Sequence, residues 1–84
     1  EDAYDVQCLT YSDAEVVEFV VKPGDKITKD RVRNLNLPDD VNIGGVVRNG
    51  KGYIVNGNTV ILPGDHVVIF CLTGALHKVE KLFN

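Results

Sequence analysis

The chain is poor in the residues from which many catalytic and metal sites are built. Its 84 residues include two cysteines, two histidines, no methionine and no tryptophan, and Ser12 is the one serine. Cys8 and Cys71 both lie in apolar, strand-like runs, which is typical of buried, reduced thiols. Small disulfide-stapled domains usually carry more cysteines, and no pair of metal ligands occurs at short spacing. We therefore expect neither a disulfide nor a metal site.

No segment has the neighbourhood of a catalytic group. Ser12 and His66 could be written into a triad with an aspartate, but Ser12 lies in a Tyr-Ser-Asp-Ala turn and not on a nucleophile elbow. His66 begins a predicted strand, and His77 lies on the solvent side of the last predicted helix. The Gly44-Gly45 pair lacks the Lys-Ser/Thr of a phosphate-binding loop and opens a strand instead of a helix. We expect no catalytic residue and no enzymatic activity.

Basic residues are too few and too scattered for a nucleic-acid partner. Nine Lys and Arg stand against twelve Asp and Glu, which gives a net charge of −3 and a pI near 5.2. Duplex binding needs clustered Lys and Arg, whereas these lie mostly in residues 22–33 and 78–81. No apolar run approaches the roughly 20 residues that span a bilayer, and no signal-peptide pattern opens the chain.

A single domain is the expectation for 84 residues. A chain of this size buries only about 60% of the surface that its unfolded form exposes, so its stability margin is thin and partner subunits often add to the core. The first residue is Glu1 and not methionine. We therefore expect the chain to be part of a longer protein.

Apolar runs separated by turn residues predict a small sheet. Asn49-Gly50 stands between two such runs and predicts a two-residue hairpin, because both residues tolerate positive φ. Six consecutive apolar residues from Val67 to Leu72 indicate a strand covered on both faces, or the central strand of the sheet. The predicted strands are Val6–Tyr11, Glu15–Val21, Ile43–Val47, Tyr53–Val55 and Val67–Leu72, with an edge segment at Thr59–Leu62.

The tripeptide Pro-Gly-Asp occurs twice, at residues 23–25 and 63–65. We interpret it as one turn solution used twice, because the flanking residues differ. Pro63 and Gly64 suit a type II turn. The Asp65 carboxylate can accept backbone N–H groups of that turn and so fix where the next strand begins. The rival interpretation is that Asp65 binds a cation.

Two short helices complete an α+β fold with a mostly antiparallel sheet. Thr28 is the predicted N-cap of a helix over Lys29–Asn34, and Leu37-Pro38 ends that segment. Thr73 is the predicted N-cap of a second helix over Gly74–Phe83. Its apolar face comprises Leu76, Val79, Leu82 and Phe83.

These features in this order resemble the C-terminal domain of the TrkA family, also called the C-lobe of the regulator of potassium conductance. The resemblance covers nearly the whole chain. No single mark is specific, but the ordered set is. The marks are AEVVEFVVKPGDKIT, then LNLP, then VNIGGVVRNGKGYIVNGNTVILPGDHVVIFCL and the closing ALHKVEKLF.

The resemblance implies a regulatory domain without chemistry of its own. TrkA-like proteins are cytosolic subunits, peripheral to the inner face of the membrane, of Trk-type potassium transporters. Their N-terminal lobe binds NAD(H) or adenine nucleotides, so no cofactor is expected in this chain. Residues 1–12 would be the end of the connection from that lobe together with the first strand, and residues 13–84 the regulatory domain. Their C-lobes pair, so we expect a homodimer, with apolar side chains of Ile43–Val47 at the seam.

Some related C-lobes bind cyclic di-adenosine monophosphate at the dimer seam. The ligand positions that the resemblance implies here are Val32, Asn36, Asn42 and Arg48. Two residues depart from the pattern. Arg33 replaces an aliphatic residue, and Pro38 stands where an arginine would bind phosphate. Loss of that charge-assisted pair argues against this dinucleotide as the ligand.

Three alternatives remain open. The same type of C-lobe also occurs in potassium channels, cation/proton antiporters and anion transporters. The chain could also be a stand-alone interaction domain or, remotely, part of a hydrolase. A G-x-G-x-x-G βαβ unit upstream would favour the potassium uptake subunit, whereas transmembrane helices upstream would favour another transporter.

Overall fold

Five strands and four short helical elements make up the part of the chain that the structure describes. The computed structural model describes residues 7–10 and 13–84, the first four by their backbone alone. The strands are β1 (Gln7–Thr10), β2 (Ala14–Val20), β3 (Val41–Arg48), β4 (Lys51–Ile54) and β5 (His66–Leu72). The helical elements are the 3-10 turns η1 (Lys26–Thr28), η2 (Val32–Asn34) and η3 (Lys81–Phe83), and the α-helix α1 (Leu76–Glu80).

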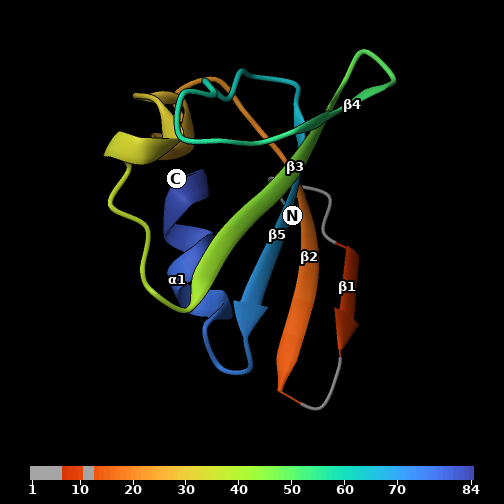
Figure 1. The fold of residues 1–84 in the computed structure, drawn as a ribbon, viewed down its shortest axis with the longest axis vertical. Coiled ribbons are helices and arrows are strands. Elements are labelled where there is room, and N and C mark those ends of the chain that lie inside the picture. The colour runs from red at the N-terminus through yellow and green to blue at the C-terminus, as the bar shows by residue number, and fades with distance from the viewer. Residues whose placement is uncertain (1–6, 11–12) are drawn as a thin grey trace.

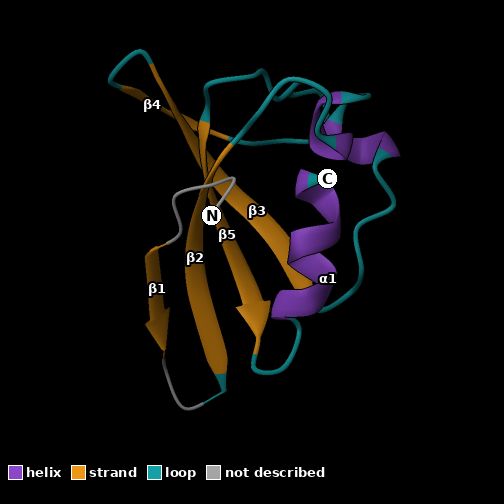
Figure 2. Ribbon diagram, turned by 180° about the vertical axis from the view of Figure 1, so that it is seen from behind, coloured by secondary structure: helices purple, strands orange, loops and turns teal. Residues whose placement is uncertain are grey.

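The strands form one sheet in the order β1-β2-β5-β3-β4, and every pairing is antiparallel. This confirms the α+β fold class. Because β1 pairs with β2, the strand predicted before residue 12 belongs to the same sheet. Residues 1–6, 11 and 12 lie outside the described part of the chain, and so do the linker prediction and Ser12. Figures 1 and 2 show α1 and the 3-10 turns together on one side of the sheet.

The predicted two-residue hairpin is confirmed, although its second strand begins at Lys51 and not at Tyr53. Asn49 and Gly50 both have positive φ, 53° and 77°, as a two-residue turn requires. They connect Arg48 to Lys51, the last cross-strand pair of β3 and β4. A bulge between Ile43 and Gly45 interrupts the pairing of β3 with β5. Beyond that bulge β3 continues into a hairpin that extends away from the helical elements (Figure 1).

The core lies between the inner face of the sheet and the helical elements. Phe19 of β2 stacks on Phe83 of η3, with ring centroids 4.3 Å apart and an interplanar angle of 13°. Both rings are almost fully buried. This stacking attaches the C-terminal segment to the sheet. The other buried apolar residues of the core are Val17, Val21, Ile27, Val41, Ile43, Val46, Ile61, Val67, Ile69, Cys71, Ala75 and Val79.

Of the two alternatives for residues 67–72, the structure shows the central strand of the sheet and not a strand covered on both faces. Val67, Ile69 and Cys71 are buried, while the exposed fractions of Phe70 and Leu72 are 47% and 54%. Every helical element packs on one side, so alternate residues of this apolar strand face outward. The hydrophobic run therefore marks a central strand with an apolar outer face, not a doubly covered strand.

The predicted helix over Lys29–Asn34 is wrong, because backbone groups of this segment form hydrogen bonds with residues far away in the sequence. The Thr28 hydroxyl donates a hydrogen bond to the Asp25 carbonyl, 2.7 Å away, inside η1. Arg31 is extended and bridges Val60. The Val32 N–H then donates to the Thr59 carbonyl at 2.9 Å. Two separate 3-10 turns result.

The second predicted helix is confirmed over a shorter range, because the chain turns before α1. Gly74 adopts a φ of 92°, and the Ala75 N–H donates to the Leu72 carbonyl at 2.9 Å. Ala75, not Thr73, is therefore the N-cap. The predicted apolar face is correct, with Val79 and Phe83 buried and Leu76 and Leu82 packed against the core.

Candidate functional site

The two Pro-Gly-Asp turns have the same hydrogen-bonding pattern. In each, the aspartate carboxylate accepts the N–H of the residue three positions earlier, at 2.8 Å for Asp25 and 2.8 Å for Asp65. Gly24 and Gly64 have φ of 86° and 91°. Both aspartate side chains are buried, at 3% and 2% exposure. The Asp65 carboxylate thus accepts an N–H within its own turn.

The turns also bond to each other through Val21. Its carbonyl accepts the Gly64 N–H at 2.8 Å, and its N–H donates to the Asp65 carbonyl at 2.9 Å. The end of β2 and the start of β5 are thereby joined. The two Pro-Gly-Asp turns therefore form one paired structural unit. The residues that flank them in the sequence gave no indication of this pairing.

A cation neutralises each of these buried carboxylates. Arg48 at the end of β3 binds Asp65 in a bidentate manner, Nε to Oδ1 at 2.8 Å and Nη2 to Oδ2 at 2.7 Å. Lys22 binds Asp25 with a distance of 3.2 Å and also donates to the Phe83 carbonyl at 3.2 Å. Burial raises the pKa of Asp65, but the hydrogen bonds from Arg48 and the Leu62 N–H outweigh it and hold this pKa below its ordinary value.

The four predicted ligand positions have different surroundings in the structure. Arg48 is engaged by Asp65 and also donates to the Val60 carbonyl at 3.1 Å. Val32 packs partly against the core. Asn42 borders a hollow beside Phe70, and Asn36, in a left-handed conformation with φ of 54°, borders another near α1.

The outer face of the sheet is apolar in its middle. Cross-strand register places Val16 of β2 opposite Phe70 of β5, and Ala14 opposite Leu72. The Phe70 ring lies over Gly44, where an added Cβ would come within 2.3 Å of Cε2. Ile54 of β4, opposite Gly45, is 86% exposed. We call Val16, Val68, Phe70, Leu72 and Ile54 the outer apolar face.

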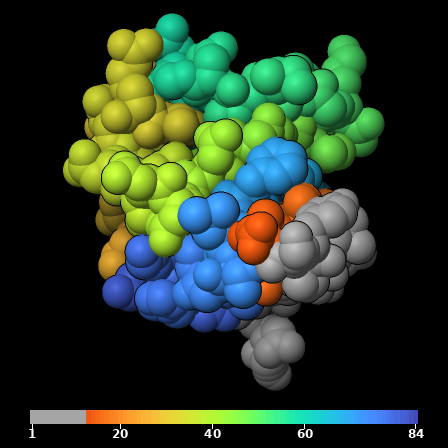
Figure 3. Space-filling model, turned by 60° about the horizontal axis from the view of Figure 1, so that its bottom comes forward, coloured from red at the N-terminus to blue at the C-terminus, as the bar shows by residue number. Residues whose placement is uncertain are grey.

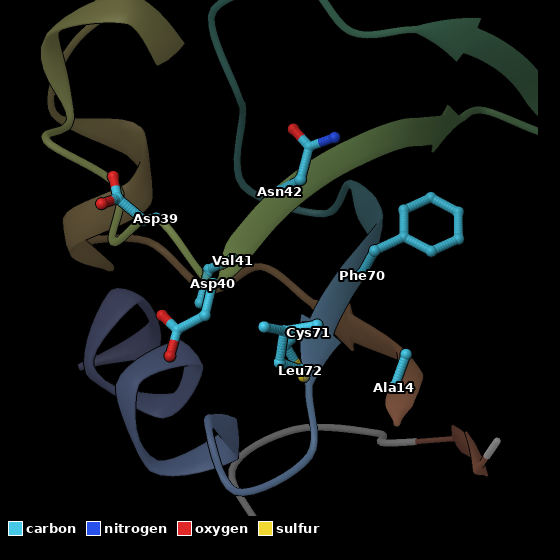
Figure 4. A pocket seen from close by; sticks show the side chains of 8 residues that line it. All are labelled: Ala14, Asp39, Asp40, Val41, Asn42, Phe70, Cys71 and Leu72. Carbon is cyan, nitrogen blue, oxygen red and sulfur yellow. The ribbon is translucent and has the colours of Figure 1, made fainter. Parts of the chain in front are cut away.

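A shallow hollow of about 210 Å³ adjoins this face. Figure 4 shows Asp39 and Asp40 at one end of it and Phe70 and Ala14 at the other. Asp40 binds Lys78 of α1 at 2.8 Å, and this hydrogen bond lowers the pKa of the Asp40 carboxyl. Its second oxygen, Oδ1, is buried and has no hydrogen-bond partner among the described residues. The hollow therefore lies at the edge of the outer apolar face, and its polar wall is formed by Asp39 and Asp40.

The two histidines that were considered for catalysis are both exposed. His66 is exposed and its Nδ1 lies 3.1 Å from Glu18 Oε2 on the outer side of the sheet, while His77 is exposed on α1. Cys71 is buried, and its Sγ lies 3.9 Å from Glu15 Oε1, while the Cys8 side chain lies outside the described part. In that part, no three His, Cys, Asp or Glu side chains gather closely enough to hold a metal ion. Nor does any described helix have the length and apolar composition needed to cross a bilayer.

The described part of the chain is thus a small α+β domain with its helical elements on one side of the sheet, two paired aspartate turns and an apolar outer face. Residues 16–84 match the TrkA-C domain, and the chain belongs to that family. The family assignment made from the ordered sequence marks is therefore confirmed.

Archaeal potassium uptake proteins are among its relatives. "Trk system potassium uptake protein TrkA homolog 2" of Methanosarcina mazei is 33% identical over 71 residues, which are 84% of this chain and 16% of the relative. A TrkA homolog of Archaeoglobus fulgidus is 31% identical over 81 residues, 94% of this chain and 19% of the relative. A third, of Pyrococcus abyssi, is 32% identical over 82 residues, 96% of this chain and 36% of the relative. The chain thus spans only about a sixth to a third of the lengths of these relatives.

Proposed function

We propose that this chain is a non-catalytic regulatory and dimerisation domain of a potassium uptake system. Membership of the TrkA-C family and the names of its relatives support the link to potassium uptake. The outer apolar face carries the proposal. It leaves large hydrophobic side chains in solvent on a chain whose own helical elements all pack on the other side, and such surfaces are typical of interaction sites.

Two copies would pair through their outer apolar faces with two-fold symmetry. Within the predicted seam segment Ile43–Val47, Val47 is 37% exposed, whereas Ile43 and Val46 are 4% and 2% exposed and belong to the chain's own core. The partner surface is better supplied by Phe70, Leu72 and Ile54.

The regulatory effect would be mechanical, because the proposed role involves no reacting group. Pairing would fix the separation and orientation of whatever precedes each copy. A small ligand at the seam would strengthen or weaken the pairing. Of the four predicted ligand positions, Asn42 fits best, since it lies opposite Phe70 on the outer side.

The wider setting follows from the resemblance. The domain would follow an N-terminal lobe that binds NAD(H) or an adenine nucleotide, in a cytoplasmic subunit at the inner face of the membrane. That subunit would act on a membrane-embedded potassium transporter.

Potassium uptake by cells that depend on the full-length protein tests this function. Phe70→Asp should lower uptake at unchanged protein abundance, because it places a charge in the seam. Val60→Asp is the matched control, since Val60 is 43% exposed and lies outside the outer apolar face. Normal uptake with Phe70→Asp, or equal loss with both variants, would refute the proposed role of this face.

A further inference from the structure

The two basic stretches of the sequence meet at one hollow of the folded chain. The hollow has a volume of about 450 Å³. Lys26 comes from η1, whereas Lys78 and Lys81 come from α1 and η3. We call this site the lysine hollow; its remaining lining residues are Leu35, Asn36, Pro38 and Leu82. Figure 3 shows the C-terminal surface in dark blue bordered by the orange to yellow-green surface of the segment around residues 22–38.

The electrostatics of the lysine hollow contrast with those of the whole chain. No carboxylate is among its lining residues, although the chain carries a net charge of −3. Lys78 is held by Asp40 at 2.8 Å, which neutralises it while fixing its position. Lys26 and Lys81 form no side-chain ion pair with any residue that the structure describes and leave two positive charges at the rim. A concave site with charge of one sign concentrates ions of the other sign.

The lysine hollow has the apolar walls and the volume to hold a molecule larger than a hydrated ion. Leu35 and Leu82 are half-buried and pack against the core, and Pro38 also lines the hollow. Asn36 adopts φ of 54°, a left-handed conformation that asparagine tolerates better than most residues other than glycine. The volume lies within the range of about 300–1,000 Å³ that is usual for small-molecule pockets.

From this geometry we infer that the lysine hollow binds small anions that carry two or more negative charges on phosphate or carboxylate groups. Lys26 and Lys81, which form no ion pair with a described residue, match two negative charges, and lysine ammonium groups bind such anions as mobile point charges. The apolar walls would hold the body of an organic anion. The site lies on a single chain, on the helical side of the sheet. The inferred anion binding therefore goes beyond the proposed pairing, and its test does not depend on whether two copies pair.

Titration of the 84-residue chain with sodium pyrophosphate, followed by backbone amide NMR at constant ionic strength, tests this inference. Saturable shifts are expected at Asn36, Lys78 and Lys81. The double variant Lys26→Gln/Lys81→Gln should bind at least about tenfold more weakly, because hydrogen bonds to charged groups contribute this much or more. Lys51→Gln is the control, since it removes an equal charge from exposed β4. A parallel titration with citrate separates phosphate from carboxylate recognition, and saturable binding of either anion supports the inference.

Three outcomes would overturn it. One is a response that never saturates. Another is an equal loss of binding in the Lys51→Gln control. The last is a chain that sediments with phosphatidylglycerol vesicles but ignores both soluble anions, because the lysines would then serve a membrane surface. Thermal melting of each variant shows whether it is folded, so a loss of binding can be assigned to the site.

Discussion

Arg48 and Asp65 form a bidentate ion pair that joins the end of β3 to the turn before β5, with N–O distances of 2.8 and 2.7 Å. The aspartate is buried and the arginine side chain is 31% exposed. The same carboxylate accepts the Leu62 N–H at 2.8 Å. The Asp65 side chain thus accepts a hydrogen bond within its own turn and, through Arg48, holds the β3–β4 hairpin against the rest of the domain.

Replacing Asp65 by alanine should destabilise the domain by about 2–4 kcal/mol, because a buried acceptor of three hydrogen bonds is lost and Arg48 is left without its partner. Urea unfolding measures this change. Asp39→Ala, at an exposed carboxylate, should change the free energy of unfolding by less than about 0.5 kcal/mol. Wild-type melting that rises with calcium, together with an Asp65→Ala variant that melts normally but ignores calcium, would favour the cation-binding interpretation instead.

Acid should remove the contribution of this ion pair. The pKa of Asp65 is lower in the folded chain than its ordinary value, so its contribution is complete above the unfolded pKa of about 3.9 and is lost as the pH falls through the folded pKa. The free energy of unfolding should therefore fall below about pH 4. Asp65→Asn should flatten part of this decline. A wild type and variant with parallel pH profiles would contradict the assignment.

The turn glycines should be intolerant of a side chain for a backbone reason. Nothing lies within 4 Å of a Cβ built on Gly24 or Gly64, yet both have φ near 90°. Alanine at either position should destabilise the domain by about 1 kcal/mol or more. Gly52→Ala is the control, because Gly52 also has open space and no positive φ. Equal melting temperatures for Gly64→Ala and Gly52→Ala would show that the turn can change its conformation.

Local chemistry predicted much of this fold. Positive φ at Asn49-Gly50 and at Gly64 could be foreseen, because few residues other than glycine and asparagine adopt it. The apolar spacing of the C-terminal segment also identified the face that it buries. These features depend on neighbours in sequence, which is why the printed residues suffice to predict them.

Features that depend on distant partners could not be predicted in the same way. Arg48 and Asp65 are 17 residues apart, and nothing local marks them as a pair. The helix predicted over Lys29–Asn34 fails because Val32 finds its hydrogen-bond partner at Thr59. Composition cannot separate a strand covered on both faces from a central strand with an apolar outer face. The lysine hollow likewise forms only when residues 22–33 and 78–81 fold together.

Sedimentation velocity of the 84-residue chain tests the central claim, pairing through the outer apolar face, most directly. The wild type should sediment as a dimer in a concentration-dependent manner up to high micromolar concentration, and Val60→Asp should do the same. Phe70→Asp should remain a folded monomer, because it places a charge where the two faces meet. A wild type that stays monomeric at high micromolar concentration, or a Phe70→Asp variant that pairs as well as the wild type, would contradict the account.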